Sequence, residues 1–231
     1  MCIRDRVFAH RGAHSAEREN TLGAYRDALE LGADGVELDV RQTADGALVL
    51  HHDPEVNGVA IARSRASDLP AFVPHLEAAL ELLEGLRVNV EVKNLQDPAE
   101  SSYDQTGAFV AAVIDVLRGS SNIQNLELSC FDLATCVDAH HYDEAIPVSF
   151  LTWRTPVLEA LELAATEGLS GVNPHYLLVN ADAQHRAHEL GLGLNVWTVN
   201  DAPDLTAMAE VGVRSVITDQ PALALRLLRP S

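Results

Sequence analysis

The sequence contains few cysteines and no long apolar runs, and each deficit excludes a class of protein. Its three cysteines in 231 residues, Cys2, Cys130 and Cys136, are an odd and scattered set. They form no disulfide framework and are typical of a reducing compartment. The longest apolar run, residues 108–114, is far too short to cross a bilayer. No transmembrane segment is therefore expected.

Basic residues are also scarce. There are 16 Lys and Arg against 34 Asp and Glu, a formal net charge of −18, and the densest basic cluster is only Arg63 and Arg65. Such a chain repels phosphate backbones, so we expect no nucleic-acid partner. An anionic small-molecule substrate remains compatible with this charge, because one metal ion and two local cations can reverse the sign of a pocket.

Residues 1–6 are charged and precede no long apolar segment, so no secretory signal is visible. We interpret them as a non-native or disordered N-terminus and residues 7–229 as a single domain. Together with the cysteines, this predicts a cytoplasmic protein. No pattern in the sequence indicates the oligomeric state.

Short apolar runs alternate with amphipathic stretches along nearly the whole chain. The runs predict strands at 7–9, 36–40, 88–92, 126–129, 147–151, 171–173, 195–199 and 215–218. The amphipathic stretches predict helices at 21–31, 75–84, 107–117, 156–167, 181–190 and 204–211. Asn20 suits the N-cap of the first helix, and Gly32 suits its end. This pattern of roughly eight βα units predicts a (β/α)8 TIM-type barrel. A doubly wound sheet usually carries a Gly-rich phosphate turn, which is not found here.

Residues 48–51 do not fit the βα repeat. They follow the strand at 36–40 after a turn at 42–46 that is too short for a helical crossover. We expect an extra hairpin strand outside the barrel count. Pro54 is soon followed by the helix expected at His75, so any insertion at the barrel mouth is minimal.

Carboxylates lie inside two of the expected strands. Glu37 and Asp39 share one face of their strand because residues i and i+2 of a strand point the same way. Glu91 and Lys93 repeat this spacing at the end of the next barrel strand. Buried carboxylates need a cation or a proton, so the pattern predicts one hard divalent cation, Mg²⁺ or Ca²⁺. The alternative is that these acids and bases pair as structural layers of the barrel.

Two histidines stand beside these carboxylates: His10 follows the first strand and His52 follows the hairpin strand. Histidine titrates near neutrality, so two of them at one site can act as general acid and general base. His51 alternates away from His52 and is expected to pack. The remaining histidines have no comparable setting: His14, His75, His140, His141, His175, His185 and His188.

These residues belong to a longer series of motifs. In order, the series is Ala9-His10-Arg11-Gly12, Glu19-Asn20-Thr21, Gly35-Val36-Glu37-Leu38-Asp39-Val40, Thr43-Ala44-Asp45-Gly46, His52-Asp53-Pro54, Val90-Glu91-Val92-Lys93, Val196-Trp197-Thr198-Val199-Asn200 and Ile217-Thr218-Asp219. By these motifs the chain resembles the glycerophosphodiester phosphodiesterase family from residue 7 to about 221. It departs from the family pattern at Arg18, where the family usually has Pro, and at Cys130-Phe131, where it usually has Ser-Phe. It also lacks the family's Arg-Thr-Thr-Gly-type stretch after Pro54.

The resemblance implies a TIM-type barrel that hydrolyses glycerophosphodiesters to an alcohol and glycerol 3-phosphate. It implies that His10 and His52 are the acid/base pair. The metal ligands that it implies are Glu37, Asp39 and Glu91. The substrate-binding residues that it implies are Arg11 and Lys93 on the phosphate, Glu19 near the metal and the glycerol end, and Trp197 in the pocket wall.

Two other functions remain open at this point. A lysophospholipase D-type phosphodiesterase would need an apolar surface at the barrel mouth for a lipid tail. Leu69, Phe72 and Val73 supply such a surface unless they pack inward. The second alternative is a catalytically silent barrel that acts as a binding protein. Loss of a metal ligand or of a histidine would indicate it, and neither is lost.

Overall fold

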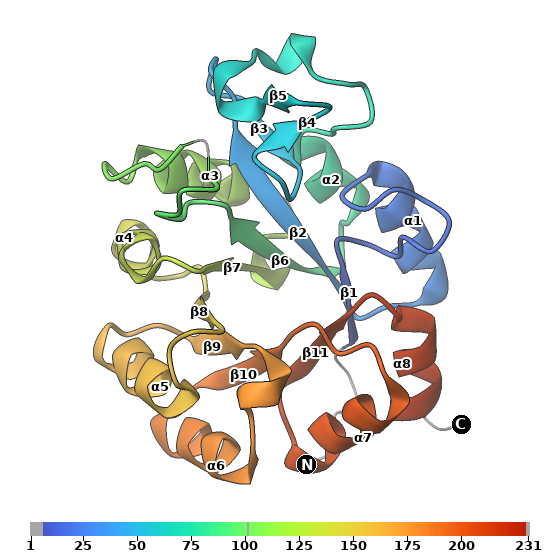
Figure 1. Cartoon of the computed structure of the whole chain (residues 1–231), viewed down its shortest axis with the longest axis vertical. Coiled ribbons are helices and arrows are strands. Elements are labelled where there is room, and N and C mark those ends of the chain that lie inside the picture. The colour runs from blue at the N-terminus through green and yellow to red at the C-terminus, as the bar shows by residue number, and fades with distance from the viewer. Residues whose placement is uncertain (1–6, 101, 230–231) are drawn as a thin grey trace.

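Eight of the apolar runs form parallel strands that close into a barrel, in a computed structural model that describes residues 7–100 and 102–229 (Figure 1). The barrel closes because β1 pairs with β2 on one side and with β11 on the other. The barrel strands are β1 (Val7–His10), β2 (Gly35–Gln42), β6 (Arg87–Val92), β7 (Leu126–Cys130), β8 (Val148–Thr152), β9 (Gly171–Pro174), β10 (Gly193–Val196) and β11 (Ser215–Thr218).

A helix follows each barrel strand, and together the helices surround the barrel (Figure 1). They are α1 (Leu22–Leu31), α2 (Leu76–Leu82), α3 (Ala108–Arg118), α4 (Leu133–Tyr142), α5 (Val157–Thr166), α6 (Ala181–Leu190), α7 (Ala202–Val211) and α8 (Pro221–Leu228). The predicted (β/α)8 barrel is confirmed. Helices α4 and α8, which were not among the predicted helical stretches, complete the eight units.

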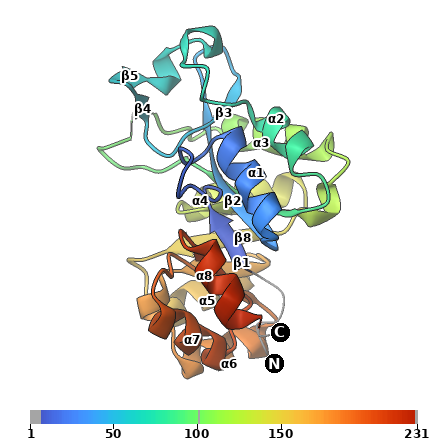
Figure 2. The same ribbon diagram turned by 90° about the vertical axis from the view of Figure 1, so that its right-hand side faces the viewer.

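The predicted hairpin strand is β3 (Leu48–Leu50), which pairs antiparallel with β2. Between β3 and α2 the chain forms a small hairpin, β4 (Glu55–Val56) and β5 (Val59–Ala60), and the 3₁₀ turns η1 (Ile61–Arg63) and η2 (Ala66–Asp68). This excursion projects from the barrel (Figures 1 and 2). Leu69, Phe72 and Val73 pack inward there, on a separate apolar cluster that includes Val56 and Ile61. They therefore do not form the apolar rim that a lipid-cleaving enzyme would need.

The start of α1 differs from the prediction. The N-cap is Thr21, whose hydroxyl accepts a hydrogen bond from the amide of Ala24. Asn20 has a φ of +53° and turns its side chain into the barrel mouth, where it binds Asp39. The helix ends at Gly32, as expected, with a φ of +74°. Asn and Thr are both favoured N-cap residues, with Asn somewhat preferred, so the tertiary contact with Asp39 decides that Thr21 is the cap.

The two faces of the barrel strands differ in character. Val36, Leu38 and Val40 are fully buried in the main apolar core. Part of the barrel interior is polar: the hydroxyl of Ser215 donates to Asn195, whose amide donates to Asn173, at 2.7 and 2.9 Å. Buried polar groups persist when they are hydrogen-bonded in this way. The interior therefore tolerates polar side chains below the carboxyl ends of the strands.

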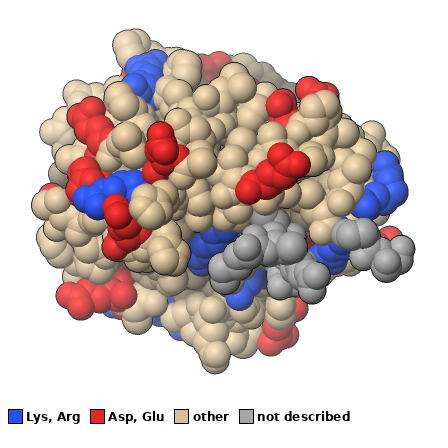
Figure 3. Space-filling model, turned by 90° about the horizontal axis from the view of Figure 1, so that it is seen from below, with Lys and Arg blue, Asp and Glu red and all other residues tan. Residues whose placement is uncertain are grey.

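On the face shown in Figure 3, acidic side chains are scattered, and the described Lys and Arg residues form small groups rather than a continuous basic surface. Within the described ranges, each helix is too short or too polar to cross a membrane.

Candidate active site

A cavity of ≈ 360 Å³ opens at the carboxyl ends of the strands, where barrel enzymes carry their reactive groups. Most of the site residues expected from the sequence line it: His10, Arg11, Glu37, His52, Glu91, Lys93 and Trp197. Asp39 and Glu19 are not among the lining residues, and both contact Arg11. Residues in or directly after β1, β2, β6 and β10 and in the turn after β3 are thus brought to one place.

Three carboxylates form the centre of the site. Glu37, Asp39 and Glu91 are buried and each offers an oxygen within 4.8 Å of the others. They meet because Asp39 of β2 lies opposite Glu91 of β6 in the parallel register. Burial, followed by repulsion from Asp39 and Glu91, raises the pKa of Glu37 well above its ordinary value. Glu37 Oε1 and Asp39 Oδ1 have no hydrogen-bond partner among the described residues.

Two cations contact this cluster. The Lys93 ammonium lies 2.7 Å from Glu91 and 3.4 Å from Asp39. The Arg11 guanidinium lies 3.2 Å from Asp39 and donates to Glu19 at 2.9 Å. Burial opposes both charges, but attraction to these carboxylates raises the pKa of Lys93 and that of Arg11. Both side chains therefore stay cationic at neutral pH.

The turn after β1 fixes Arg11. Arg11 has a φ of +54° and Gly12 a φ of +87°, so the chain reverses directly after the strand. The reversal lets the Arg11 amide donate to Glu37 Oε2 at 3.1 Å. An added Cβ on Gly12 would lie 2.8 Å from the backbone carbon of Ala24 in α1. Only glycine fits this close approach at positive φ.

Asp39 is held in the ionised form. Burial alone would raise its pKa, but Lys93, Arg11 and then the two site histidines hold the pKa of Asp39 well below its usual range. The Asn20 amide donates to Asp39 Oδ2 at 2.7 Å, and Asn20 Oδ1 accepts from the Tyr25 hydroxyl at 2.9 Å. Asn20 thus orients one carboxylate of the cluster from outside the strands.

His10 is held from the opposite end of the chain. Its Nδ1 lies 2.6 Å from Asp219 Oδ1, and its Nε2 lies 3.9 Å from Glu37. His14 Nε2 also binds Asp219 Oδ1, at 3.2 Å. Despite partial burial, the hydrogen bonds from His10 and His14 hold the pKa of Asp219 far below its ordinary value. In return, the hydrogen bond to Asp219 raises the pKa of His14.

His52 lies in the turn that follows β3 and lines the same cavity as His10. Its Nδ1 is 2.8 Å from the exposed carboxylate of Asp53. That hydrogen bond lowers the pKa of Asp53. In both histidines Nδ1 is therefore the ring nitrogen bound to a carboxylate, and Nε2 is not used in that bond.

One wall of the cavity is apolar and consists of Phe131, Leu151, Trp153, Trp197 and Ile217. Trp197 is anchored by its indole N–H, which donates to the carbonyl of Asn173 at 2.8 Å. Its ring packs edge-on against Phe131, with centroids 5.4 Å apart. Trp153 is 56% exposed. An apolar wall opposite a charged cluster suits a small molecule with a polar and a less polar end.

Sequence reasoning missed three residues that the structure brings into the site. By sequence, Asp219 is only part of a motif, His14 has no distinctive setting, and Asn20 has the chemistry of a helix cap. The Thr-Asp pair at the end of the last strand was the available signal for Asp219, since strand ends of a barrel meet at one face. Nothing local in the sequence marks His14, because its partner lies 205 residues away.

The fold and site define a (β/α)8-barrel enzyme with a carboxylate cluster, two cations and two histidines around one cavity. Comparison with known families agrees with the resemblance in the motifs. The model of the glycerophosphoryl diester phosphodiesterase family matches residues 10–71 and 59–223. The chain belongs to this family and is a phosphodiesterase of the class that hydrolyses glycerophosphodiesters.

Individual relatives match over nearly their full length. A glycerophosphodiester phosphodiesterase of Caldanaerobacter subterraneus is 25% identical over 244 residues, which cover 96% of this chain and 97% of the relative. A crystal structure of a glycerophosphodiester phosphodiesterase from Parabacteroides distasonis has a TM-score of 0.85 and 26% identity, covering 97% of each chain. An Oleispira antarctica phosphodiesterase, solved with the product sn-glycerol-3-phosphate, shares the fold with a TM-score of 0.87 at 21% identity, covering 97% of this chain and 96% of that one.

Proposed function

We propose that the protein hydrolyses glycerophosphodiesters to an alcohol and glycerol 3-phosphate at this cavity. His10 and His52 transfer the protons, and Glu37, Asp39 and Glu91 hold one divalent cation. A single observation carries the proposal. Glu37 Oε1 is buried without a hydrogen-bond partner in the described chain, and Asp39 Oδ1 has only the ion pair with Lys93 at 3.4 Å, in a cluster next to the cavity that both histidines line.

The residues present fit a divalent cation. Three carboxylates carry a formal charge of −3, and the two neighbouring cations, Arg11 and Lys93, leave about one negative charge uncompensated. An all-oxygen donor set suits Mg²⁺ or Ca²⁺. When bound, such an ion supplies Lewis-acid stabilisation of phosphoryl charge. The raised pKa of Glu37 reflects the burial and repulsion that the ion would relieve.

Arg11 and Lys93 bind the phosphate of the substrate. Both line the cavity while their other contacts are with site carboxylates. Arg11 can contact two phosphate oxygens through its planar fork, whereas Lys93 acts as a point charge. Glu19 holds the Arg11 guanidinium from the outer side at 2.9 Å. Trp197 packs against the organic part of the substrate.

The two histidines divide the proton transfers. One removes a proton from the nucleophile, and the other protonates the leaving alcohol. Asp219, ionised at neutral pH, accepts from Nδ1 of His10 and stabilises the imidazolium that forms during transfer. Nε2, which lies toward Glu37, is then the atom of His10 that exchanges the proton. The product complex of the Oleispira antarctica relative supports glycerol 3-phosphate as the product.

The test is the release of glycerol 3-phosphate from glycerophosphocholine and glycerophosphoethanolamine with Mg²⁺, Ca²⁺ or EDTA. We expect release that requires a divalent ion and is lost in Glu37→Ala. Glu81→Ala, which removes an exposed glutamate of α2, is the matched control and should behave as wild type. Equal release in EDTA, or in Glu37→Ala, would overturn the carboxylate site.

A second substrate class is favoured by one feature of the structure. The apolar wall that includes the exposed Trp153 lies at the cavity and could receive the tail of a lysophospholipid. Lysophosphatidylcholine in the same assay tests it. Faster turnover of the lipid than of glycerophosphocholine would make lysophospholipase D-type cleavage the main activity. Faster turnover of glycerophosphocholine would indicate that the apolar wall contacts small head groups.

A further inference from the structure

His52 differs from His10 in how its backbone is held. His10 ends a barrel strand and is fixed by pairing with Glu37 of β2. His52 lies in a turn outside the barrel, after β3 has ended at Leu50. The amide of His51 donates to the carbonyl of Asp39 at 3.0 Å, and this bond begins the turn. A proton-transferring side chain at such a position needs an additional anchor to keep its geometry.

Arg41 provides this anchor. It follows the metal-facing residues of β2 and is 5% exposed. Its Nε donates to the carbonyls of His51 and His52, at 3.2 and 2.9 Å, and its second terminal nitrogen also donates to His52. The side chain therefore donates two hydrogen bonds, from Nε and one terminal nitrogen, to the backbone carbonyl of His52. Its hydrogen bonds go to the backbone of residues 51 and 52 and to a carboxylate on the other side, and its charge opposes the protonated form of the neighbouring Lys93.

Glu100 holds the other side of the same guanidinium. Its carboxylate accepts two hydrogen bonds from Arg41, at 2.6 and 3.1 Å, and its side chain is only 13% exposed. Glu100 lies in the connection between β6 and α3, which Lys93 begins. Two-pronged pairing of this kind fixes the plane of a guanidinium, which a single point contact does not.

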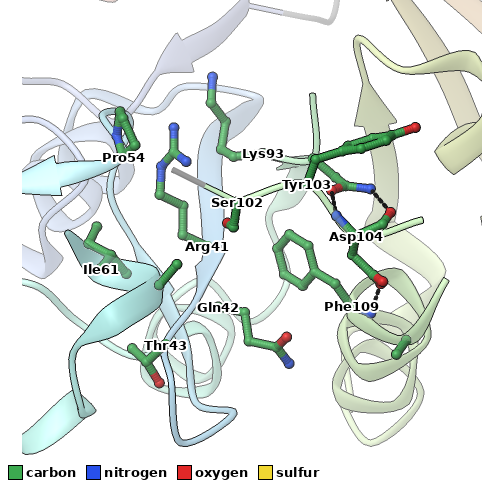
Figure 4. A pocket seen from close by; sticks show the side chains of 13 residues that line it. Arg41, Gln42, Thr43, Pro54, Ile61, Lys93, Ser102, Tyr103, Asp104 and Phe109 are labelled. Carbon is green, nitrogen blue, oxygen red and sulfur yellow. Dashed lines mark hydrogen bonds between the residues drawn. The ribbon is translucent and has the colours of Figure 1, made fainter. Parts of the chain in front are cut away.

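The close view of the neighbouring cavity, ≈ 320 Å³ in volume, shows how Arg41 is directed (Figure 4). Arg41 and Lys93 extend in the same direction from adjacent strands, whereas Gln42 points the opposite way. The Arg41 guanidinium thus lies on the side of the strand ends, next to the turn that carries His52. Alternation along β2 places the two side chains, Arg41 and Gln42, on opposite faces.

We propose that Arg41 and Glu100 are positioning residues that fix the backbone of His52 for proton transfer and couple it to the β6–α3 connection. This rests on the proposed role of His52 in catalysis. The fork of Arg41 holds the carbonyl of His52, and Glu100 keeps the fork in plane. Loss of either residue displaces the histidine without removing a group that touches the substrate.

The test is a double-mutant cycle on kcat and KM for glycerophosphocholine, using Arg41→Gln, His52→Ala and the double variant. A displacement of about 1 Å costs on the order of 10²-fold in rate, so we expect Arg41→Gln to lower kcat by about 10–100-fold with KM changed less than about threefold. In the His52→Ala background the same substitution should change kcat by less than about threefold. Arg41→Lys keeps the charge but not the fork, and its kcat should lie closer to that of Arg41→Gln than to wild type.

Glu100→Gln keeps an oxygen facing Arg41 and serves as the second variant if Arg41→Gln fails to fold; we expect a smaller loss in kcat, again absent in the His52→Ala background. Arg214→Gln is the control for loss of a partly buried arginine and should leave kcat unchanged, because Arg214 directly precedes β11 and pairs with Glu127. An equal loss in wild-type and His52→Ala backgrounds overturns the positioning role. Full activity of His52→Ala overturns the proposed role of His52 in catalysis. A kcat that is lowered in His52→Ala but unchanged in Arg41→Gln overturns only the positioning role of Arg41.

Discussion

Replacing Asp219 by Asn tests whether this carboxylate, which follows the last barrel strand, controls proton transfer by His10 at the end of the first. Asp219 Oδ1 accepts from His10 and His14, and Oδ2 accepts from the Asn200 amide at 2.7 Å. An asparagine offers one oxygen where the aspartate offers two. It must either present its NH₂ to the Asn200 donor or present it to His10, where it would favour the wrong tautomer of the imidazole.

The magnitude follows from the bond that is lost. A hydrogen bond to a charged group contributes about 1.5–3 kcal/mol, and 1.36 kcal/mol corresponds to a factor of ten in rate. If this stabilisation is realised when His10 carries the proton, Asp219→Asn should lower kcat by roughly 10–150-fold. The substrate does not touch Asp219 in the proposed arrangement, so KM should change little.

The assay is the initial rate of glycerol 3-phosphate release at saturating glycerophosphocholine, with the melting temperature as a check on folding. Asp201→Asn is the matched control, because Asp201 is exposed and its side chain makes no capping hydrogen bond at the start of α7. In the His10→Ala background, Asp219→Asn should add no further loss. A kcat within twofold of wild type for the folded Asp219→Asn protein would refute the argument that Asp219 acts through His10.

Further predictions concern the histidines and the turn after β1. His10→Ala and His52→Ala should each lower kcat by about 10²–10⁴-fold, and near-normal turnover in either would remove that residue from the mechanism. The raised pKa of His14 means that its bond to Asp219 contributes stability that is fully present below the unfolded pKa, about 6.5, and is lost as pH rises through the higher folded value. His14→Gln should therefore lower the melting temperature by about 2–4 °C at pH 5.5, for a loss of about 1 kcal/mol, and by less at pH 8.5; a gap that widens with pH would contradict this. Gly12→Ala puts a methyl group 2.8 Å from the backbone of α1 at a φ of +87°. It should destabilise the fold by about 2–4 kcal/mol, which lowers the melting temperature in a thermal scan by roughly 5–15 °C. An unchanged melting temperature would show that the turn relaxes freely.

The predicted architecture could be read from local patterns because barrel strands and helices repeat at a regular spacing. The strand at 36–40 lies within β2, and the hairpin strand expected at 48–51 is β3. The carboxylate cluster was predictable for a similar reason. Glu37 and Asp39 share a face by strand alternation, and Glu91 repeats the pattern on the next barrel strand.

Other features were not predictable from local pattern. Asn20 has the chemistry of a helix cap, but its side chain binds Asp39 and Thr21 caps the helix instead. Leu69, Phe72 and Val73 read equally well as an exposed rim and as a small core, and only packing against Val56 and Ile61 decided between them. In each case two local conformations have similar energies, so the long-range contact selects one.

By itself the sequence determined which residue types sit at strand ends and with what spacing, since side-chain direction in a strand depends only on local geometry. That was enough to place two histidines, three acids and two cations at the same end of a barrel. Which residues touch was decided by strand pairing around the barrel. Pairing of β11 with β1, which closes the barrel, brings Asp219 to His10 across 209 positions. Pairing of β2 with β6 likewise brings Glu100, which follows β6, to Arg41 of β2 across 59 positions. Contacts of this range depend on the packing of whole strands and helices, and no local pattern contains them.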